Sequence, residues 1–323
     1  MRLAASFAVA ARAHGLSRAR SLEAAQAAAR SYREHMALFA EMRALDLWYT
    51  RIEVDTLVQL ARSVETRKLR RRMVAKARHS TMAQLFPRLT EVVGGQPRFA
   101  DHPPLIYHAK HIPDFEQNVQ TFWRHYVETL PEERRPLIAR YRLVDVAIKV
   151  VGVGSVGTRC AIALLLADRD DPLVLQFKQA RPSVLEPYAG ASRYPNQGLR
   201  VVIGQRLMQA SSDIFLGYSH AMHLKEDYYV RQLRDMKLSL ELDHMSAGDF
   251  LDYAGVCGWE LARAHGKTGD AAVISGYLGQ SDAFERAIGK FALAYSDQTE
   301  RDHAALRAAV KAGRIHARIE SDA

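Results

Sequence analysis

The chain has few of the residues that mark secreted, metal-bound or membrane proteins. It contains two cysteines in 323 residues, Cys160 and Cys257, which form no C-x-x-C pair. This argues against a disulfide framework and a cysteine-based zinc knuckle, and it is typical of a reducing cytosol. The longest apolar run, at residues 161–167, is too short to span a bilayer. We therefore expect a cytoplasmic protein with no membrane partner.

Proline occurs only between Pro87 and Pro195, and residues 1–86 contain a single glycine. Because proline and glycine interrupt helices, this predicts long helices with short joints at the N-terminal end. The first residues mimic a signal peptide, but their apolar core is short and arginines follow closely, so we interpret them as a helix. Two adjacent glycines and four prolines predict a loop over residues 92–114.

The expected secondary structure changes along the chain. Residues 141–240 read as short strands and turns, with a helix at 198–210 and a strand at 227–233. A capping box at residues 246–249 predicts a further helix, and residues 282–312 form a last helical stretch. In the N-terminal part, apolar residues at helical spacing predict a buried helix face. They are Leu38, Phe39, Met42, Leu45, Leu47 and Trp48.

Positive charge is concentrated near the N-terminus. The net charge is +9, and residues 1–90 carry 17 Lys and Arg against 7 Asp and Glu. The densest patch runs from Arg67 to Arg78. It could bind nucleic acid or another polyanion, or it could be a solvated helix face. The second interpretation is favoured because no aromatic residues interleave the charges, so we do not expect nucleic acid as a partner.

The strongest motif is a glycine-rich turn after a β-branched run. Gly152, Gly154 and Gly157 have G-x-G-x-x-G spacing, with Ser155 between the last two. Glycines in this pattern let backbone N–H groups approach an anion, because no Cβ stands in the way. The motif therefore predicts a cradle for nucleotide phosphates. Two unrelated folds use it, so the residues that follow must decide between them.

A dinucleotide-binding fold needs a helix after the third glycine and a second strand that ends in an acid. A kinase-like fold needs a hairpin and then a strand that carries a lysine. Residues 158–167 are ambiguous, but residues 173–177 form a clear strand that ends at Lys178. Glu186 is the only acid between Pro172 and Ser212. These residues favour the kinase-like fold, and the dinucleotide fold remains the alternative.

Lys178 is the first candidate for a nucleotide contact, because a fixed cation on a rigid strand can pair with phosphates. A surface lysine at the end of a strand is the simpler interpretation. In kinases a glutamate on a neighbouring helix holds this lysine in place. Glu186 is the nearest candidate, although Pro182 and Pro187 argue against a helix around it.

No other group of residues predicts chemistry. His102, His108 and His111 cluster in the proline-rich loop, but no nearby carboxylate or cysteine completes a metal site. His265 and Cys257 lie on one apolar helix face and are typical of core residues. The Ser211–Asp213 and Thr268–Asp270 segments lack a base that could activate a nucleophile. We therefore expect no metal ligands and no catalytic residues in this chain.

Several segments together carry a family resemblance. They are GVGSVGTR at 152–159, LQFK at 175–178, SVLEPY at 183–188, GQRLMQ at 204–209, SDIFLG at 212–217, YVRQLRDMK at 229–237 and LARAH at 261–265, with further matches at 277–279, 281–284 and 294–298. The chain resembles the bacterial family called domain of unknown function 2252, considered kinase-like. The resemblance extends over nearly the whole chain.

The resemblance also implies what this chain lacks. Family members carry a Gly-Asp-x-His-x-x-Asn-Phe-Gly motif and a Phe-Asp-Glu motif before the glycine turn, similar to a kinase catalytic loop and metal-binding aspartate. The kinase order would then be circularly permuted. This sequence contains neither motif, and its first residues resemble the helix that follows them. We expect Met1 to be an internal start that leaves the chain truncated and catalytically incomplete.

The expected fold is α+β and protein-kinase-like, mostly helical with a small antiparallel sheet. Residues 1–140 would form the helical part of the larger lobe, residues 141–240 a β-rich nucleotide-binding lobe, and residues 241–323 helices that pack on the larger lobe. The glycine turn and Lys178 would bind ATP with Mg²⁺, and residues 233–236 would lie near the base, as in a kinase hinge.

The expected role is nucleotide binding, with phosphotransfer to a small-molecule acceptor as the activity that the resemblance implies for the family. Cofactor contacts are expected from Gly152, Gly154, Ser155, Gly157, Lys178 and Glu186. Two alternatives remain. One is a dinucleotide-binding oxidoreductase, and the other is a non-enzymatic protein that binds polyanions through its arginine-rich patch.

Overall fold

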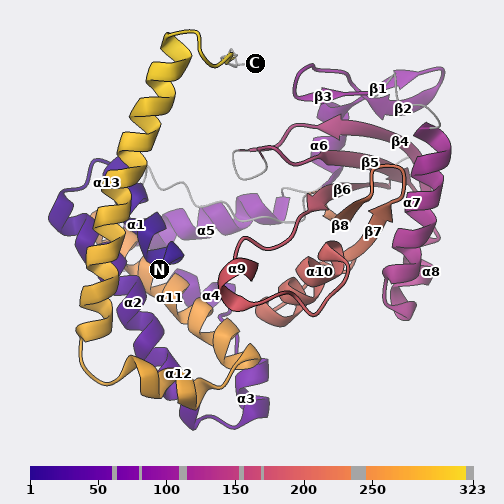
Figure 1. Cartoon of the computed structure of the whole chain (residues 1–323). Helices are drawn as coiled ribbons and strands as arrows, with labels where there is room; N and C mark the ends of the chain where they lie inside the picture. Colours follow the sequence, from indigo (N-terminus) through magenta and orange to yellow (C-terminus); the bar gives the residue numbers. More distant parts are fainter. Residues whose placement is uncertain are drawn as a thin grey trace. The chain divides into compact units, whose positions relative to one another are not determined.

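The computed structural model describes residues 1–59, 64–79, 82–108, 115–152, 156–168, 171–233 and 245–317 (Figure 1). The chain divides into two compact units. Unit 1 comprises Met1–Arg70 and Leu240–Ala323, and unit 2 comprises Arg71–Ser239. Residues 71–140, which we expected with the helices, group with the sheet instead. Each unit is described by itself below.

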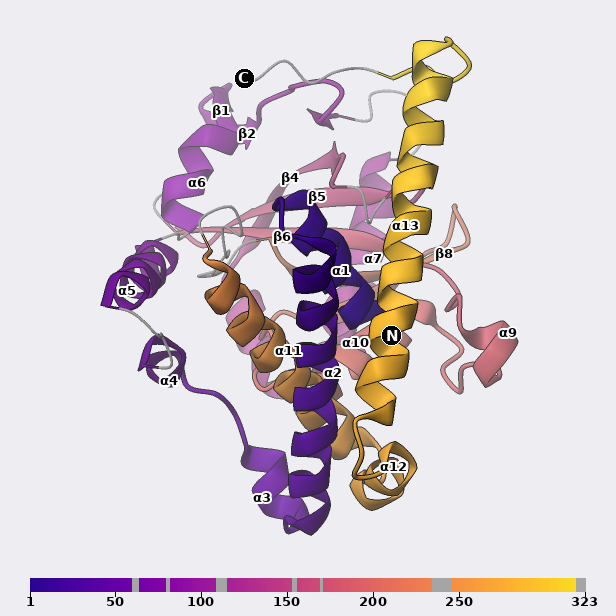
Figure 2. The same cartoon turned by 90° about the vertical axis from the view of Figure 1, so that its left-hand side faces the viewer.

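Unit 1 is built from helices that surround one long central helix, α2. Figure 2 shows α1, α11 and α13 alongside it. The helices are α1 (Arg2–Ala13), α2 (Arg18–Glu41), α3 (Ala44–Tyr49), α4 (Val54–Gln59), α11 (Ala247–Thr268), α12 (Ala271–Leu278) and α13 (Ala283–Lys311), while α5 (Val64–His79) crosses the boundary between the units. None of the described helices is long and apolar enough to cross a bilayer.

Small residues let these helices pack closely. The buried face of α2 is rich in alanine, including Ala24, Ala25 and Ala28. A Cβ on Gly258 of α11 would lie 2.2 Å from the carbonyl oxygen of Ala28, so only glycine fits at this crossing. The capping box predicted at residues 246–249 is present in part. Ser246 caps α11 by accepting a hydrogen bond from the backbone N–H of Asp249 at 3.2 Å.

The prediction that apolar residues 38–48 form one buried helix face is wrong. Phe39 and Leu47 are buried, but Leu38 is 56% exposed and Leu45 65% exposed. The reason is local, because α2 ends at Glu41 and Met42 and Arg43 adopt extended conformations. The helical period therefore does not continue from α2 into α3, and apolar residues on the two helices do not share a face.

Unit 2 contains a six-stranded sheet in the order β3-β4-β5-β6-β8-β7 and a separate hairpin, β1-β2, with antiparallel pairing at every recorded contact between described strands (Figure 1). The strands are β1 (Thr90–Val93), β2 (Gln96–Phe99), β3 (Ile106–Tyr107), β4 (Arg142–Lys149), β5 (Cys160–Leu166), β6 (Pro172–Ala180), β7 (Gly217–Ala221) and β8 (Glu226–Gln232). The ambiguous residues 158–167 thus form a strand, and the predicted loop over 92–114 contains most of a hairpin.

The two faces of the sheet are buried by different helices, because side chains alternate along each strand. On one face Val146, Ala163 and Phe177 pack with residues of α7 (Phe115–Thr129). On the other face Ile162 and Val174 pack with residues of α6 (Met82–Leu89). We call these the α7 face and the α6 face. The remaining elements of unit 2 are η1 (Glu132–Arg134), α8 (Arg135–Ile138), α9 (Glu186–Ala189) and α10 (Gln197–Met208).

Candidate functional site

The glycine-rich segment joins two neighbouring antiparallel strands. β4 ends at Lys149 and β5 begins at Cys160, so residues 150–159 form the connection, here called the glycine turn. Gly157 has a φ of +74°, a left-handed conformation that favours glycine. Arg181 donates a hydrogen bond to its carbonyl oxygen. Gly152 is exposed. Gly154 and Ser155, which we also expected to contact a cofactor, lie outside the described residues.

Lys178 lies on a central strand of the sheet, next to the glycine turn. On β6 it is paired with Cys160, the first residue of β5, and on its other side with Tyr229 of β8. Because side chains alternate along a strand, Lys178 shares a face with Gln176 and Val174, and Val174 packs on the α6 face. The lysine therefore lies on the α6 face of the sheet, at the end of β6 that is next to the glycine turn.

Positive charges gather around the thiol of Cys160 at this place. Burial raises the pKa of the Cys160 thiol, while the charges of Lys178, Lys149 and Arg231 act in the opposite direction. The guanidinium of Arg231 donates to Oε1 of Gln176 at 3.4 Å. We call Lys149, Lys178 and Arg231 the cation cluster. Three cations close to one buried thiol create a local positive potential, which favours an anion.

Glu186 does not hold Lys178 in the way that we expected. Its Oε1 accepts a hydrogen bond from the backbone N–H of Ser183 at 3.3 Å. Within the described residues it forms no ion pair with Lys178. The physical reason is the short helix α9, which begins at Glu186 and has Pro187 as its next residue, so the carboxylate folds back on its own helix start. The carboxylate of Glu186 therefore lies at Ser183, and its expected contact with a cofactor stays a prediction.

The helix that follows the lysine strand is firmly anchored to β8. Asn196 caps α10, and its Nδ2 donates to Asp227 of β8 at 2.7 Å. The backbone N–H of Gln197 donates to the other oxygen of Asp227 at 2.7 Å. A Cβ on Gly198 would lie 2.2 Å from the carbonyl oxygen of Tyr228, so the backbones touch. The sequence of α10 contains no carboxylate, so a glutamate partner for Lys178 is absent from this helix.

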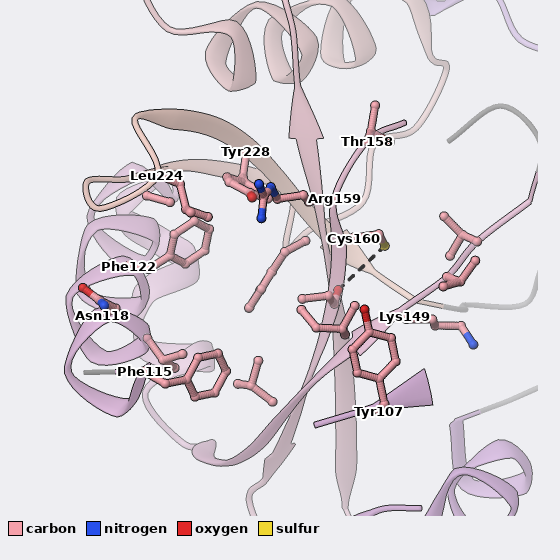
Figure 3. Close-up of a pocket in the computed structure, with 18 of the residues that line it drawn as sticks. Tyr107, Phe115, Asn118, Phe122, Lys149, Thr158, Arg159, Cys160, Leu224 and Tyr228 are labelled. Atoms are coloured by element: carbon pink, nitrogen blue, oxygen red, sulfur yellow. Dashed lines mark hydrogen bonds between the residues drawn. The ribbon is translucent and has the colours of Figure 1, made fainter. Parts of the chain in front are cut away.

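A pocket of about 830 Å³ lies on the α7 face beside the glycine turn (Figure 3). Its walls come from β3, β4, the glycine turn, β5, β6, the start of α7, and strands β7 and β8 with the turn between them. Of the residues that we predicted to bind a cofactor, Gly157 lines it and Lys178 does not. Sequence reasoning missed this pocket. The signal available was the aromatic spacing of Phe115 and Phe122 on α7, which reads equally well as a core face.

His108 occupies a position that the sequence did not reveal. Its Nδ1 lies 2.7 Å from Asp101 Oδ1, and its Nε2 lies 3.0 Å from Asp145 Oδ2 on β4. Burial disfavours the charged imidazole, but the hydrogen bonds to both carboxylates outweigh it, so the pKa of His108 is raised. Among the described residues, no group of three or more ligating side chains could hold a metal ion. His111 lies outside the described residues.

The arginine-rich patch lies on α5, where Arg67, Lys68, Arg71 and Arg72 are exposed. Arg70 is partly buried, and its guanidinium lies 3.6 Å from the buried carboxylate of Asp249. Part of this patch therefore supports the packing of unit 1, and the rest is a solvated helix face.

Sequence comparison identifies the family of the chain. No curated protein and no solved structure matches it. A family model described as uncharacterized protein conserved in bacteria matches residues 1–309, which is nearly the whole chain. This confirms the resemblance seen in the motifs around the glycine turn. The chain belongs to that bacterial family, DUF2252.

Proposed function

We propose that unit 2 is an ATP-binding lobe of the protein-kinase type. The phosphates of Mg·ATP contact the glycine turn and Lys178 on the α6 face of the sheet. The observation that carries this proposal is the order of the parts. The glycine turn joins β4 to β5, Lys178 lies on the next strand, and helix α10 and two further strands follow. Protein kinases use this order of glycine loop, lysine strand and helix.

The charge distribution supports the same site. A nucleoside triphosphate is strongly anionic, and hydrogen bonds to charged groups are about twice as strong as neutral ones. The cation cluster lies at the end of the glycine turn, around Cys160. Residues 173–211 contain one acid, Glu186, and its carboxylate accepts a hydrogen bond from the backbone N–H of Ser183. A phosphate would therefore meet favourable charge on this face.

The dinucleotide alternative fits these elements less well. A dinucleotide fold uses a parallel sheet and opens a helix at the third glycine. Here the described pairings of the sheet are antiparallel, and the segment after Gly157 forms strand β5. The second strand after the turn, β6, also ends at Ala180 and carries Lys178 near its end, with no acid there that could bind ribose.

The activity that we propose for unit 2 is nucleotide binding. Phosphoryl transfer requires a carboxylate that holds Mg²⁺ and another that orients the acceptor hydroxyl. Neither family motif that resembles these parts occurs in the sequence, and α10 carries no glutamate for Lys178. Phosphotransfer to a small molecule is our proposal for the family, and unit 2 would supply the nucleotide-binding lobe for it.

Calorimetry with Mg·ATP tests the proposal. We expect the chain to bind Mg·ATP, and we expect Lys178→Met to bind it roughly tenfold to hundredfold more weakly, since a charged hydrogen bond contributes about 1.5–3 kcal/mol. The matched control is Arg142→Met, which removes an exposed cation at the far end of β4. We expect this variant to bind as tightly as the unmodified chain.

Three outcomes would contradict the proposal. A folded chain that binds no Mg·ATP, equal affinity in Lys178→Met, or tighter binding of NAD than of Mg·ATP would each reject the lobe as we assign it. Binding of NAD in particular would favour the dinucleotide alternative.

A further inference from the structure

The pocket on the α7 face borders the proposed nucleotide site, because residues of the glycine turn and Lys149 of the cation cluster also line it. It lies on the opposite side of the sheet from Lys178, and neighbouring residues of the same strands point to the two sites. Phe177 and Ala161 line the pocket, whereas Lys178 faces the other way. From its size, lining and charge, we infer that this pocket binds a small molecule with an apolar, aromatic-sized body and one anionic group.

The dimensions and the lining fit an apolar body. A volume of about 830 Å³ lies within the ~300–1,000 Å³ range of small-molecule sites. Aromatic rings come from four different elements, with Tyr107 on β3, Phe115 and Phe122 on α7, Phe177 on β6 and Tyr228 on β8. Figure 3 shows the side chains of Phe115, Phe122 and Leu224 on one side of the pocket. Such walls recognise rings by burial and by edge contacts.

The charge of the lining selects an anion. The described lining residues include Lys149, Arg159 and His223 but no aspartate or glutamate, while the lining residue His108 is already paired with Asp101 and Asp145. Arg159 is the best-placed cation, because its Nε donates to Glu226 Oε1 at 3.2 Å and is thereby oriented. Glu226 is held in turn by the Tyr228 hydroxyl at 2.7 Å. Figure 3 shows the Arg159 guanidinium beside Tyr228.

This orientation leaves donors for a ligand. No hydrogen bond to Nη1 or Nη2 of Arg159 is recorded from the described residues, and the side chain is 60% exposed. A guanidinium with two available N–H groups matches a carboxylate, sulfonate or phosphate in bidentate geometry. The apolar body would then lie against Phe177 and Ala161, with the anionic group at Arg159.

Two fluorescent probes test the inference directly. They are 1-anilinonaphthalene-8-sulfonate and N-phenyl-1-naphthylamine, which share one aromatic body and differ in the sulfonate. We expect saturable binding of both probes, with the sulfonate bound more tightly. Arg159→Gln should remove this preference while binding of the neutral probe stays within about twofold. The control Arg193→Gln, which changes an arginine of unit 2 outside the pocket lining, should leave both affinities unchanged.

A second pair of variants tests the location. Ala161 is partly exposed toward the pocket, so Ala161→Trp should fill the space and weaken both probes at least tenfold. The control Val184→Trp places the same side chain at an exposed position outside the lining. Circular dichroism and a melting curve establish that each variant is folded, because loosely packed proteins also bind such dyes.

The outcomes separate clearly. Loss of both probes in folded Ala161→Trp, together with loss of the sulfonate preference in Arg159→Gln, supports the inference. Equal affinity of Ala161→Trp and the unmodified chain places the dye elsewhere and overturns it. Absence of saturable binding by either probe also overturns it. A sulfonate preference that survives in Arg159→Gln overturns the anionic part. None of these results depends on Mg·ATP binding, so the two proposals fail independently.

Discussion

At the scale of single residues, the sequence predicts a position that depends on neighbouring residues, but not a hydrogen-bond partner from a distant part of the chain. Lys178 stands at the end of an apolar run, and its strand and its nearness to the glycine turn could be predicted from neighbouring residues. One partner of His108 could not, because Asp145 lies on β4, 37 positions further along the chain. Glu186 was the nearest acid in sequence to Lys178, but the start of α9 keeps its carboxylate at Ser183.

The raised pKa of His108 predicts a pH-dependent contribution to stability. The charged imidazole stabilises the fold fully below its unfolded pKa, about 6.5, and this contribution is lost as the pH rises through the higher pKa of the folded state. We therefore expect His108→Gln to lower the melting temperature by a few degrees at pH 5.5 and by less at pH 8.5. The measurement is a pair of melting curves at each pH.

The control for this experiment is His303→Gln, which changes an exposed histidine on α13. It should shift the melting temperature little at either pH. A His108→Gln effect that is equal at both pH values, or larger at pH 8.5, would mean that the imidazole is not held as a cation between Asp101 and Asp145.

At the scale of elements, prediction succeeded where local chemistry is strong. Helix α10 and strand β8 lie within one or two residues of their expected bounds, since a cap and a β-branched, aromatic run mark them. The helix face over residues 38–48 failed, because two extended residues separate α2 from α3. Residues 158–167, which were ambiguous between helix and strand, form strand β5. Helices cover both faces of β5, and an apolar run without alternation is typical of a strand that is buried on both faces.

The packing of α10 on β8 predicts a position-specific effect of adding one methyl group. Gly198→Ala should destabilise unit 2 by about 1–3 kcal/mol, since its Cβ would lie 2.2 Å from the Tyr228 carbonyl oxygen. On the same helix, Gly204 has open space at its Cβ position. Gly204→Ala should be neutral or stabilise by up to about 1 kcal/mol. Denaturant unfolding measures both, and equal effects would contradict this packing.

A second matched pair tests the crossing of α2 and α11 in unit 1. A Cβ on Gly258 would lie 2.2 Å from the Ala28 carbonyl oxygen, while Gly255 on the same helix has open space. We expect Gly258→Ala to lower the midpoint of denaturant unfolding clearly, and Gly255→Ala to leave it unchanged or raise it. If both variants unfolded at the same denaturant concentration, the helices would not approach as closely as described.

At the scale of the whole molecule, the first boundary between the units was the least predictable feature, because residues 71–140 group with the sheet. Unit 1 is discontinuous, because its two segments are separated in the sequence by unit 2. A bond such as that between Arg33 on α2 and the buried Glu285 on α13, at 3.0 Å, joins residues 252 positions apart. No local pattern signals such a pair. The fold class, α+β with an antiparallel sheet, could be predicted because residues 141–240 read as short strands and turns between helical segments.

The most direct test of the central claim is a crystal structure of the chain with Mg²⁺ and a non-hydrolysable ATP analogue. Our account predicts phosphate oxygens within about 4 Å of Lys178 Nζ, on the α6 face, with backbone N–H groups of the glycine turn directed at them. A nucleotide bound in the pocket on the α7 face, or at any place away from Lys178, would contradict the account.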